Sequence, residues 1–201
     1  MTSPVSPVDW TGFYIGGLVG YGWGDKDVAD AEEPDETGSY NVDGWLGGIE
    51  AGANWQSGRY VFGVEGDIAW TDINGGGLID GDDPISTQID FLATLTGRVG
   101  VAWQRALFYV EGGGAWVNED HTLIGDINNP PGVSDTISDN RFGGLLGVGV
   151  EYALRGNWSL KAEYNYLWFG SEQHAFEVDE PDFINIDQDL QTFKVGINFR
   201  F

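Results

Sequence analysis

The residues that could do chemistry in this sequence are mainly carboxylates, and many of them alternate with apolar residues. The chain of 201 residues has 32 acidic residues, nine basic residues and two histidines, and its formal net charge is −23. Charged residues at every second position of a strand share one face, where they must pair once they leave water. The charged residues in such alternating segments are Glu50, Glu65, Asp67, Glu111, Glu151, Glu163, Arg98, Lys161, Lys194 and Arg200.

A second group of acidic residues lies in four long polar stretches, 24–40, 72–87, 118–140 and 171–189. These stretches hold 23 of the acidic residues and one base, Lys26. Hard cations prefer clustered carboxylate oxygens, so Asp80, Asp82 and Asp83 are candidate ligands for a divalent cation. The spacing in DGDDP does not match an EF-hand loop. The simpler interpretation is that these acids are solvated, and such a surface repels nucleic acid.

Catalytic chemistry finds little support in the sequence. The two histidines, His121 and His174, both fall in the long stretches, and there is no cysteine. No phosphate-binding loop follows a strand, and no serine lies in a nucleophile elbow. The pairing of His174 with Glu172 is the one hint of a base and its orienting carboxylate. We therefore predict that the protein is not an enzyme and has no cofactor.

The sequence segments that contain these residues alternate between apolar and polar residues, with a period of two residues. Eight strands are expected, at 12–23, 41–55, 60–71, 89–103, 107–117, 141–154, 158–169 and 190–201. The connections QSGR, QRA and RGN are short, and they alternate with the four long acidic stretches. Long and short connections in alternation are typical of an antiparallel up-and-down barrel. We predict an N-terminal segment at 1–9 and one barrel domain at 10–201.

The apolar faces of these strands are too bulky for the inside of an eight-stranded barrel. Its lumen admits only a narrow column of side chains, whereas the apolar set includes nearly all nine tryptophans and about thirty other bulky residues. We therefore expect the apolar face to point outward into lipid, and the small or charged face to point into the lumen. This arrangement defines a transmembrane barrel with all its backbone groups paired.

Tryptophans near the strand ends support this orientation. Pairs separated by ten residues, such as Trp45 and Trp55, are roughly 25 Å apart along the membrane normal, which matches the apolar band of an outer-membrane barrel and its aromatic girdles. The predicted girdle residues are Trp23, Trp45, Trp55, Trp70, Trp103, Trp116, Trp158 and Trp168. Trp10 has the wrong parity and is placed just outside the first strand.

The chain ends on the alternating stretch QTFKVGINFRF, whose apolar residues are Phe193, Val195, Ile197, Phe199 and Phe201. If the last strand pairs with the first, the sheet closes and no edge is left unpaired in lipid. The start of the chain, MTSPVSPVDW, lacks the charged and apolar regions of a signal peptide. Such a start is expected either for a cytosolic protein or for a mature form with a replacement Met1. The family resemblance described next implies a processed or recombinant form.

Most of the strand residues resemble the small outer-membrane β-barrels of the OmpA-like transmembrane superfamily, in particular the alphaproteobacterial porin-family and opacity-type proteins. The resemblance lies in WTGFYIGGLVGYGWG, GGIEAGANWQSGRYVFGVEGDIAW, LTGRVGVAW, GLLGVGVEYALRGNWSLKAEYNYLWFG and FKVGINFRF. It implies a Gram-negative outer-membrane location, a structural or surface-antigen role, and a C-terminal signal for the barrel-assembly machinery. For some members it also implies haemin binding, here through His121 or His174, or a narrow channel.

We therefore expect a structural outer-membrane barrel with acidic loops at the cell surface. Its expected partners are membrane lipids and lipopolysaccharide. The lumen is expected to be filled by an ion-paired network of Glu50, Glu65, Glu111, Glu151 and Glu163 with Arg98, Lys161 and Lys194. Two alternatives stay open: binding of divalent cations, lipopolysaccharide or haemin through the loops, and a low-conductance channel along the lumen.

Overall fold

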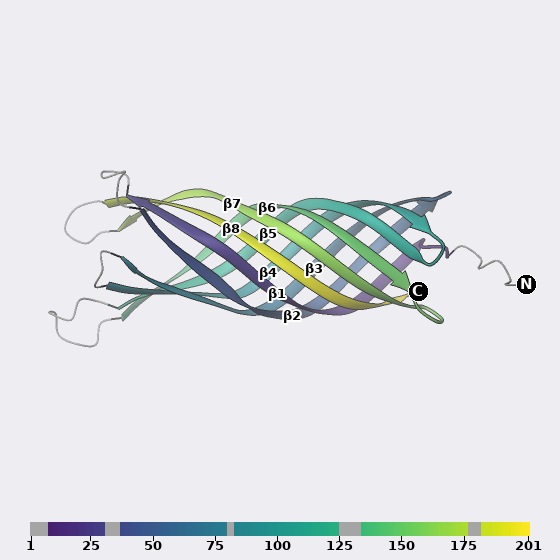
Figure 1. Ribbon diagram of the computed structural model, residues 1–201, viewed down its shortest axis with the longest axis horizontal. Coiled ribbons are helices and arrows are strands. Elements are labelled where there is room, and N and C mark those ends of the chain that lie inside the picture. The colour runs from purple at the N-terminus through teal and green to yellow at the C-terminus, as the bar shows by residue number, and fades with distance from the viewer. Residues whose placement is uncertain (1–7, 31–36, 80–82, 125–133, 177–181) are drawn as a thin grey trace, which may run out of the picture.

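The computed structural model describes residues 8–30, 37–79, 83–124, 134–176 and 182–201. These residues form one closed barrel of eight antiparallel strands in sequence order (Figure 1). The strands are β1 (Gly12–Asp30), β2 (Thr37–Ser57), β3 (Tyr60–Ile79), β4 (Asp83–Trp103), β5 (Ala106–Ile124), β6 (Ser134–Ala153), β7 (Trp158–Phe176) and β8 (Asp182–Arg200). β8 pairs with β1 and closes the sheet. The predicted fold class is confirmed.

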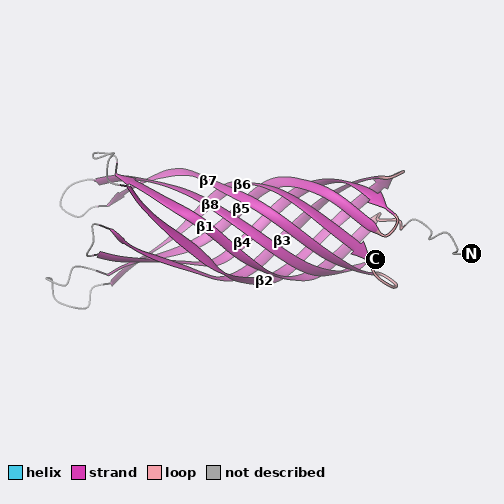
Figure 2. Cartoon of the chain, viewed as in Figure 1, coloured by secondary structure: helices cyan, strands magenta, loops and turns pink. Residues whose placement is uncertain are grey.

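Strands and short turns account for almost the whole described chain (Figure 2). Glycine makes two of the turns possible, because Gly58 and Gly156 have φ angles of 63° and 68° in the left-handed region. In the turn between β4 and β5, Gln104 adopts the left-handed conformation, with a φ angle of 56°. Among the described residues, no helix is long and apolar enough to cross a membrane.

The strands are longer than their apolar pattern predicted. β1 and β2, for example, remain paired as far as Ala29 and Thr37, well inside a stretch that the sequence assigned to a loop. The predicted boundaries were wrong because apolar alternation marks only the part of a strand that faces lipid. Backbone pairing continues in water, because strands with polar side chains form the same ladder of backbone hydrogen bonds as strands with apolar ones.

The outer surface carries the apolar side chains, as lipid contact requires. Trp45 and Trp103 are 70% and 67% exposed, and Phe201 is 74% exposed. Of the eight predicted girdle tryptophans, seven are exposed and Trp23 is partly exposed. Of the alternating residues in the terminal stretch, Phe193, Val195, Ile197 and Phe201 are exposed, and Phe199 is partly exposed.

The sequence suggested a lumen lined only by small and charged residues, but bulky apolar side chains also point into it. Apolar side chains form a cluster near the short turns and a larger cluster near the opposite end, and the charged residues lie between them. The expectation was wrong because inward positions such as Leu18, Leu46 and Leu145 are bulky and apolar. These positions lie where an inward side chain meets other side chains rather than water.

Candidate functional site in the barrel lumen

The buried charged side chains between the two apolar clusters form a layer across the lumen, here called the charged layer. Lys161 on β7 is at its centre and is fully buried. Its Nζ lies 2.7 Å from Glu50 Oε2, 2.9 Å from Glu65 Oε1 and 3.0 Å from Glu163 Oε2. The three carboxylates come from β2, β3 and β7. A single ammonium group therefore links distant parts of the barrel wall, and its attraction to three carboxylates offsets the cost of removing it from water.

Lys194 on β8 forms the second cationic centre. Its Nζ lies 2.6 Å from Asp67 Oδ2 and 2.8 Å from Glu163 Oε1. Glu163 is thus shared by both lysines, and it also accepts hydrogen bonds from the Tyr109 hydroxyl at 2.8 Å and from the Asn165 side-chain amide at 2.7 Å. Every one of these donors fixes the same carboxylate, so Glu163 is held in one geometry.

Arg98 on β4 is the third cation. Its Nη1 lies 3.2 Å from Glu65 Oε2, and its Nη2 lies 3.6 Å from Glu151 Oε2. The guanidinium group also lies over the rings of Tyr14 and Tyr109, with 4.7 Å and 5.0 Å between its central carbon and the ring centroids. A planar guanidinium fits this stacked site in a way that an ammonium group cannot.

Smaller hydrogen bonds complete the charged layer. The Tyr14 hydroxyl donates to Glu65 Oε2 at 2.5 Å, and the Ser159 hydroxyl donates to Glu151 Oε1 at 2.5 Å. Arg98 Nε donates to the Asn54 side-chain carbonyl at 3.0 Å. The layer is therefore a connected polar network rather than a set of separate ion pairs.

Glu111 differs from the other buried carboxylates. It forms no ion pair among the described residues, and it accepts a hydrogen bond from the Thr96 hydroxyl at 3.3 Å. One oxygen each of Glu65, Glu111 and Glu163 lies within 4.8 Å of the other two, and the same holds for Glu50, Glu65 and Asp67. Such triads could coordinate a cation, but the ammonium groups of Lys161 and Lys194 already bind most of these carboxylates.

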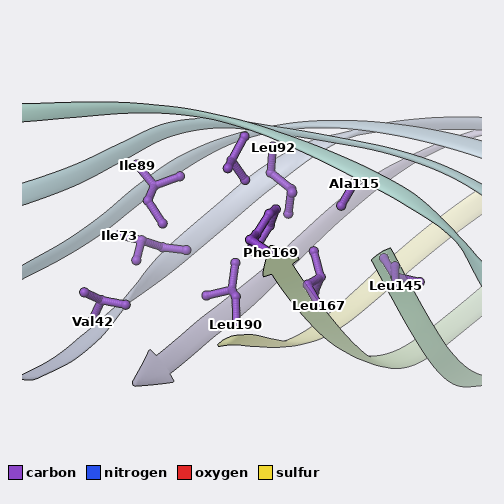
Figure 3. Close-up of a cluster of buried hydrophobic side chains, with 10 residues drawn as sticks. Val42, Ile73, Ile89, Leu92, Ala115, Leu145, Leu167, Phe169 and Leu190 are labelled. Atoms are coloured by element: carbon purple, nitrogen blue, oxygen red, sulfur yellow. The ribbon is translucent and has the colours of Figure 1, made fainter. Parts of the chain in front are cut away.

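An apolar cluster fills the lumen on the long-loop side of the charged layer (Figure 3). Its members come from seven strands and are at most 4% exposed. They are Val42, Ile73, Ile89, Leu92, Ala115, Val117, Leu145, Leu167, Phe169 and Leu190. The sequence analysis missed this cluster, although Leu145, Leu167 and Leu190 interrupt the polar parity of their strands and could have indicated it.

Trp10 closes the other end of the lumen and has no exposed surface. It packs in a cluster with Val61, Leu107, Tyr109 and Ala153. Its backbone N–H donates to Gln56 Oε1 at 2.8 Å. The Arg200 guanidinium lies over its ring at 4.6 Å, so Arg200, which was grouped with the network by parity, instead caps the barrel end.

The remaining predicted site residues are placed as follows. The eight members of the predicted lumen network all lie buried in the charged layer. Asp80 and Asp82 lie outside the described residues. Asp83, His121 and His174 belong to β4, β5 and β7, but their side chains are also outside the described part of the structure. The predicted lumen residues therefore lie together as buried charged groups, whereas the candidate loop ligands have no described geometry.

Comparison with known proteins gives matches over nearly the whole chain. The family model for the outer membrane protein beta-barrel domain matches residues 2–201. The 31 kDa outer-membrane immunogenic protein of Brucella melitensis is 30% identical over 212 residues, covering 99% of this chain and 87% of the relative. The 22 kDa outer membrane protein of Rhizobium leguminosarum bv. viciae is 30% identical over 202 residues, covering 99% and 82%.

Two solved structures share the fold at low sequence identity. The outer membrane protein OprG of Pseudomonas aeruginosa superposes with a TM-score of 0.60 at 14% identity, covering 95% of this chain and 96% of that one. The outer membrane protein AlkL, determined in lipid bilayers, gives a TM-score of 0.53 at 12% identity, covering 100% and 96%. Both similarities support the architecture alone.

Proposed function

Because this chain belongs to the outer membrane protein beta-barrel domain family, we propose that it is a structural barrel with a sealed lumen that displays acidic loops at the cell surface. Its place in the bacterial outer membrane follows from its relatives, which are outer-membrane proteins. In barrels of this class the long loops face outward from the cell and the short turns face the periplasm. The acidic strand ends and loops would accordingly meet the exterior.

The contacts of Lys161 are the main support for the proposal that the lumen is sealed. An ion that moved along the axis would have to pass an ammonium group held by Glu50, Glu65 and Glu163. It would also have to cross the apolar cluster on one side and the cluster around Trp10 on the other. Transfer of a charge through apolar surroundings is costly, so these three layers favour a plug over a pore.

Recording from planar bilayers tests this function. The folded parent protein, with insertion verified by protease protection, should give no unitary current steps. Steps that change size in Glu163→Gln, but not in the lipid-facing variant Leu146→Ala, would show that current runs through the lumen and would overturn the proposal. Leu146 is 60% exposed on the outer surface, so it is a matched control for effects of substitution alone.

The second candidate function is binding of divalent cations that bridge the acidic loops to lipopolysaccharide. The observation that favours it is the concentration of acidic residues in the four long stretches, which are connected to strand ends at one side of the barrel. Haemin binding rests on resemblance alone, and no contact among the described residues supports it.

Thermal unfolding in calcium and in sodium at matched ionic strength tests cation binding. Ligand at ten times the dissociation constant stabilises a one-site protein by roughly 1.4 kcal/mol. The combined variant Asp80→Asn, Asp82→Asn and Asp83→Asn should lose a calcium-specific gain if these residues bind the ion. An equal effect of both salts on the parent would leave solvated loops as the better interpretation.

A further inference from the structure

A groove lies on the lipid-facing wall of the barrel and crosses β5, β6, β7 and β8. Its volume is about 460 Å³, within the roughly 300–1,000 Å³ that is typical of small-molecule sites. The outward side chains that line it are Phe108, Val148, Val150, Ala162, Tyr164 and Phe193. Because this lining is apolar and aromatic, the groove fits a hydrocarbon chain better than a polar ligand.

Ala162 is the smallest of these outward side chains. The other outward residues of β7 between Trp158 and Trp168 are leucine or tyrosine. Ala162 pairs with Val150 on β6 and with Val195 on β8, so its short side chain lies between larger neighbours. The sequence therefore places one small residue in a row of bulky ones, and this accounts for the depression in the wall.

Two arginines lie in the turns next to this groove. Arg105 is in the turn between β4 and β5, and Arg155 is in the turn between β6 and β7. The Arg105 guanidinium donates to the Leu154 carbonyl oxygen and lies over the outward Tyr152 ring, with 5.7 Å between its central carbon and the ring centroid. A guanidinium has several N–H donors, so Arg105 keeps donors that can bind a phosphate group.

The arginines and the groove are at neighbouring depths in the membrane. Tyr152 and Val150 are consecutive outward residues of β6, roughly 7 Å apart along the strand. The girdle residues Trp103 and Trp158 adjoin the two turns, so the arginines lie at the level of the lipid head groups and the groove lies in the acyl region. Figure 1 shows these turns at the same end of the barrel as the C-terminus, the end that faces the periplasm in barrels of this class.

The charges beside the groove favour an anionic head group. In segments 102–108 and 150–160 the basic residues are Arg105 and Arg155, and the one acidic residue, Glu151, is buried in the lumen. A negatively charged head group is therefore attracted by both arginines without an opposing exposed acid in these segments. A second copy of the chain in a symmetric contact would bring its own two arginines to the same level and would be repelled.

We propose that this wall binds one anionic phospholipid of the periplasmic leaflet. Its phosphate group contacts Arg105 and Arg155, and one of its acyl chains lies in the groove over Ala162. The Tyr152 ring and the Leu154 carbonyl hold the Arg105 guanidinium in position for the phosphate. The site does not depend on whether the lumen conducts ions, so its failure would leave the proposal of a sealed lumen unchanged.

Native mass spectrometry of the full-length protein in a zwitterionic detergent tests the head-group contact. Phosphatidylglycerol should bind with a stoichiometry of one and at least about fivefold more tightly than phosphatidylcholine with the same acyl chains, since one arginine near a charged head group contributes about that factor. The double variant Arg105→Gln and Arg155→Gln should bind the two lipids equally.

Arg59→Gln is the matched control for the head-group contact. Arg59 lies over the outward Tyr60 ring at 5.1 Å, but in the turn between β2 and β3, away from the groove. This variant should keep the preference for phosphatidylglycerol. Equal binding of both lipids by the parent, or the same loss of preference in Arg59→Gln as in the double variant, would overturn the proposal.

Ala162→Phe tests the groove, because the added ring occupies the space over Ala162. It should lower the affinity for phosphatidylglycerol, whereas Ala51→Phe, at an outward alanine of β2, should not. A phosphatidylglycerol with a photoreactive diazirine in its acyl chain should label residues 148–164 in the parent and label them less in Ala162→Phe. Labelling spread evenly around the barrel would contradict a defined site. A dimer that is lost in Ala162→Phe would assign the groove to a second copy and would also overturn the proposal.

Discussion

The ammonium group of Lys161 lies 2.9 Å from the Glu65 carboxylate, although the two residues are 96 positions apart in the chain. They lie on β7 and β3, which are opposite strands of the eight-stranded barrel. The lumen is therefore narrow enough for one long side chain to span it. Through this contact, strands on opposite sides of the barrel wall are joined by one ion pair.

Replacing Lys161 by methionine should destabilise the barrel strongly. The variant keeps most of the side-chain volume but leaves three buried carboxylates without their shared cation. Removing one partner of a buried ion pair costs about 3–5 kcal/mol. Urea unfolding in lipid measures the loss, and Arg59→Met in the exposed turn is the control that should unfold like the parent. Equal midpoints for Lys161→Met and the parent would exclude a stabilising network.

Glu111→Gln and Glu163→Gln should differ, although both remove one buried negative charge. Glu163 contacts both lysines, so its neutralisation should cost about 2–4 kcal/mol. Glu111 has no ion pair among the described residues and lies near Glu65 and Glu163, so its neutralisation relieves repulsion and should cost less than about 1 kcal/mol. The same urea measurement compares them, and a greater loss in Glu111→Gln would contradict the assigned contacts.

Trp10→Ala should weaken the short-turn end of the barrel. The ring is fully buried against Leu107 and Ala153, and truncation of a buried tryptophan costs about 3–5 kcal/mol. Trp103→Ala, which removes an outward ring near the same end, is the control and should cost less in a detergent micelle. Chemical unfolding followed by far-ultraviolet circular dichroism measures both, and equal losses would argue against a role as an internal cap.

Asp9 should contribute a pH-dependent increment of stability. The Thr11 backbone N–H donates to Asp9 Oδ1 at 2.9 Å, and this hydrogen bond lowers the pKa of Asp9. A lowered folded-state pKa stabilises the protein above the ordinary value of about 4, and the benefit is lost as pH falls through the lower folded value. The difference in urea midpoint between the parent and Asp9→Asn should thus be present at pH 7 and shrink below about pH 4. A difference that grows on acidification would contradict this assignment.

The two tryptophan groups should mark the two edges of the membrane band. Single-tryptophan variants that retain Trp45 or Trp55 should be quenched most by lipids whose quencher lies near the head group. A tryptophan placed at Ile49, which is outward and midway between them, should be quenched most by a quencher deep in the acyl chains. Equal quenching of Trp55 and the mid-band tryptophan would contradict the proposed depth.

The eight strands and their orientation could be predicted because both depend on local pattern. A period of two assigns Trp45 and Glu50 to opposite faces without knowledge of any partner strand. The volume of the apolar set then excluded the barrel interior as its location. The strand ends could not be predicted, because polar residues such as those between Gly24 and Asp30 pair in water without leaving an apolar signature.

The sequence by itself determined which residues point into the lumen over most of the membrane band, and therefore that opposite charges would have to meet there. Only the tertiary structure decided which ones meet, because strand register and tilt set the level of each residue along the axis. Thus Lys161 meets Glu50 and Glu65, while Glu111 is left without an ion pair in the described part of the lumen. A register shift between Ile89 and Phe91 on β4 brings both Ile89 and Leu92 inward, which strict alternation forbids. The pairing of β6 with β7 likewise ends at Gly143 and Phe169, before either strand ends, and no short stretch of either strand indicates this.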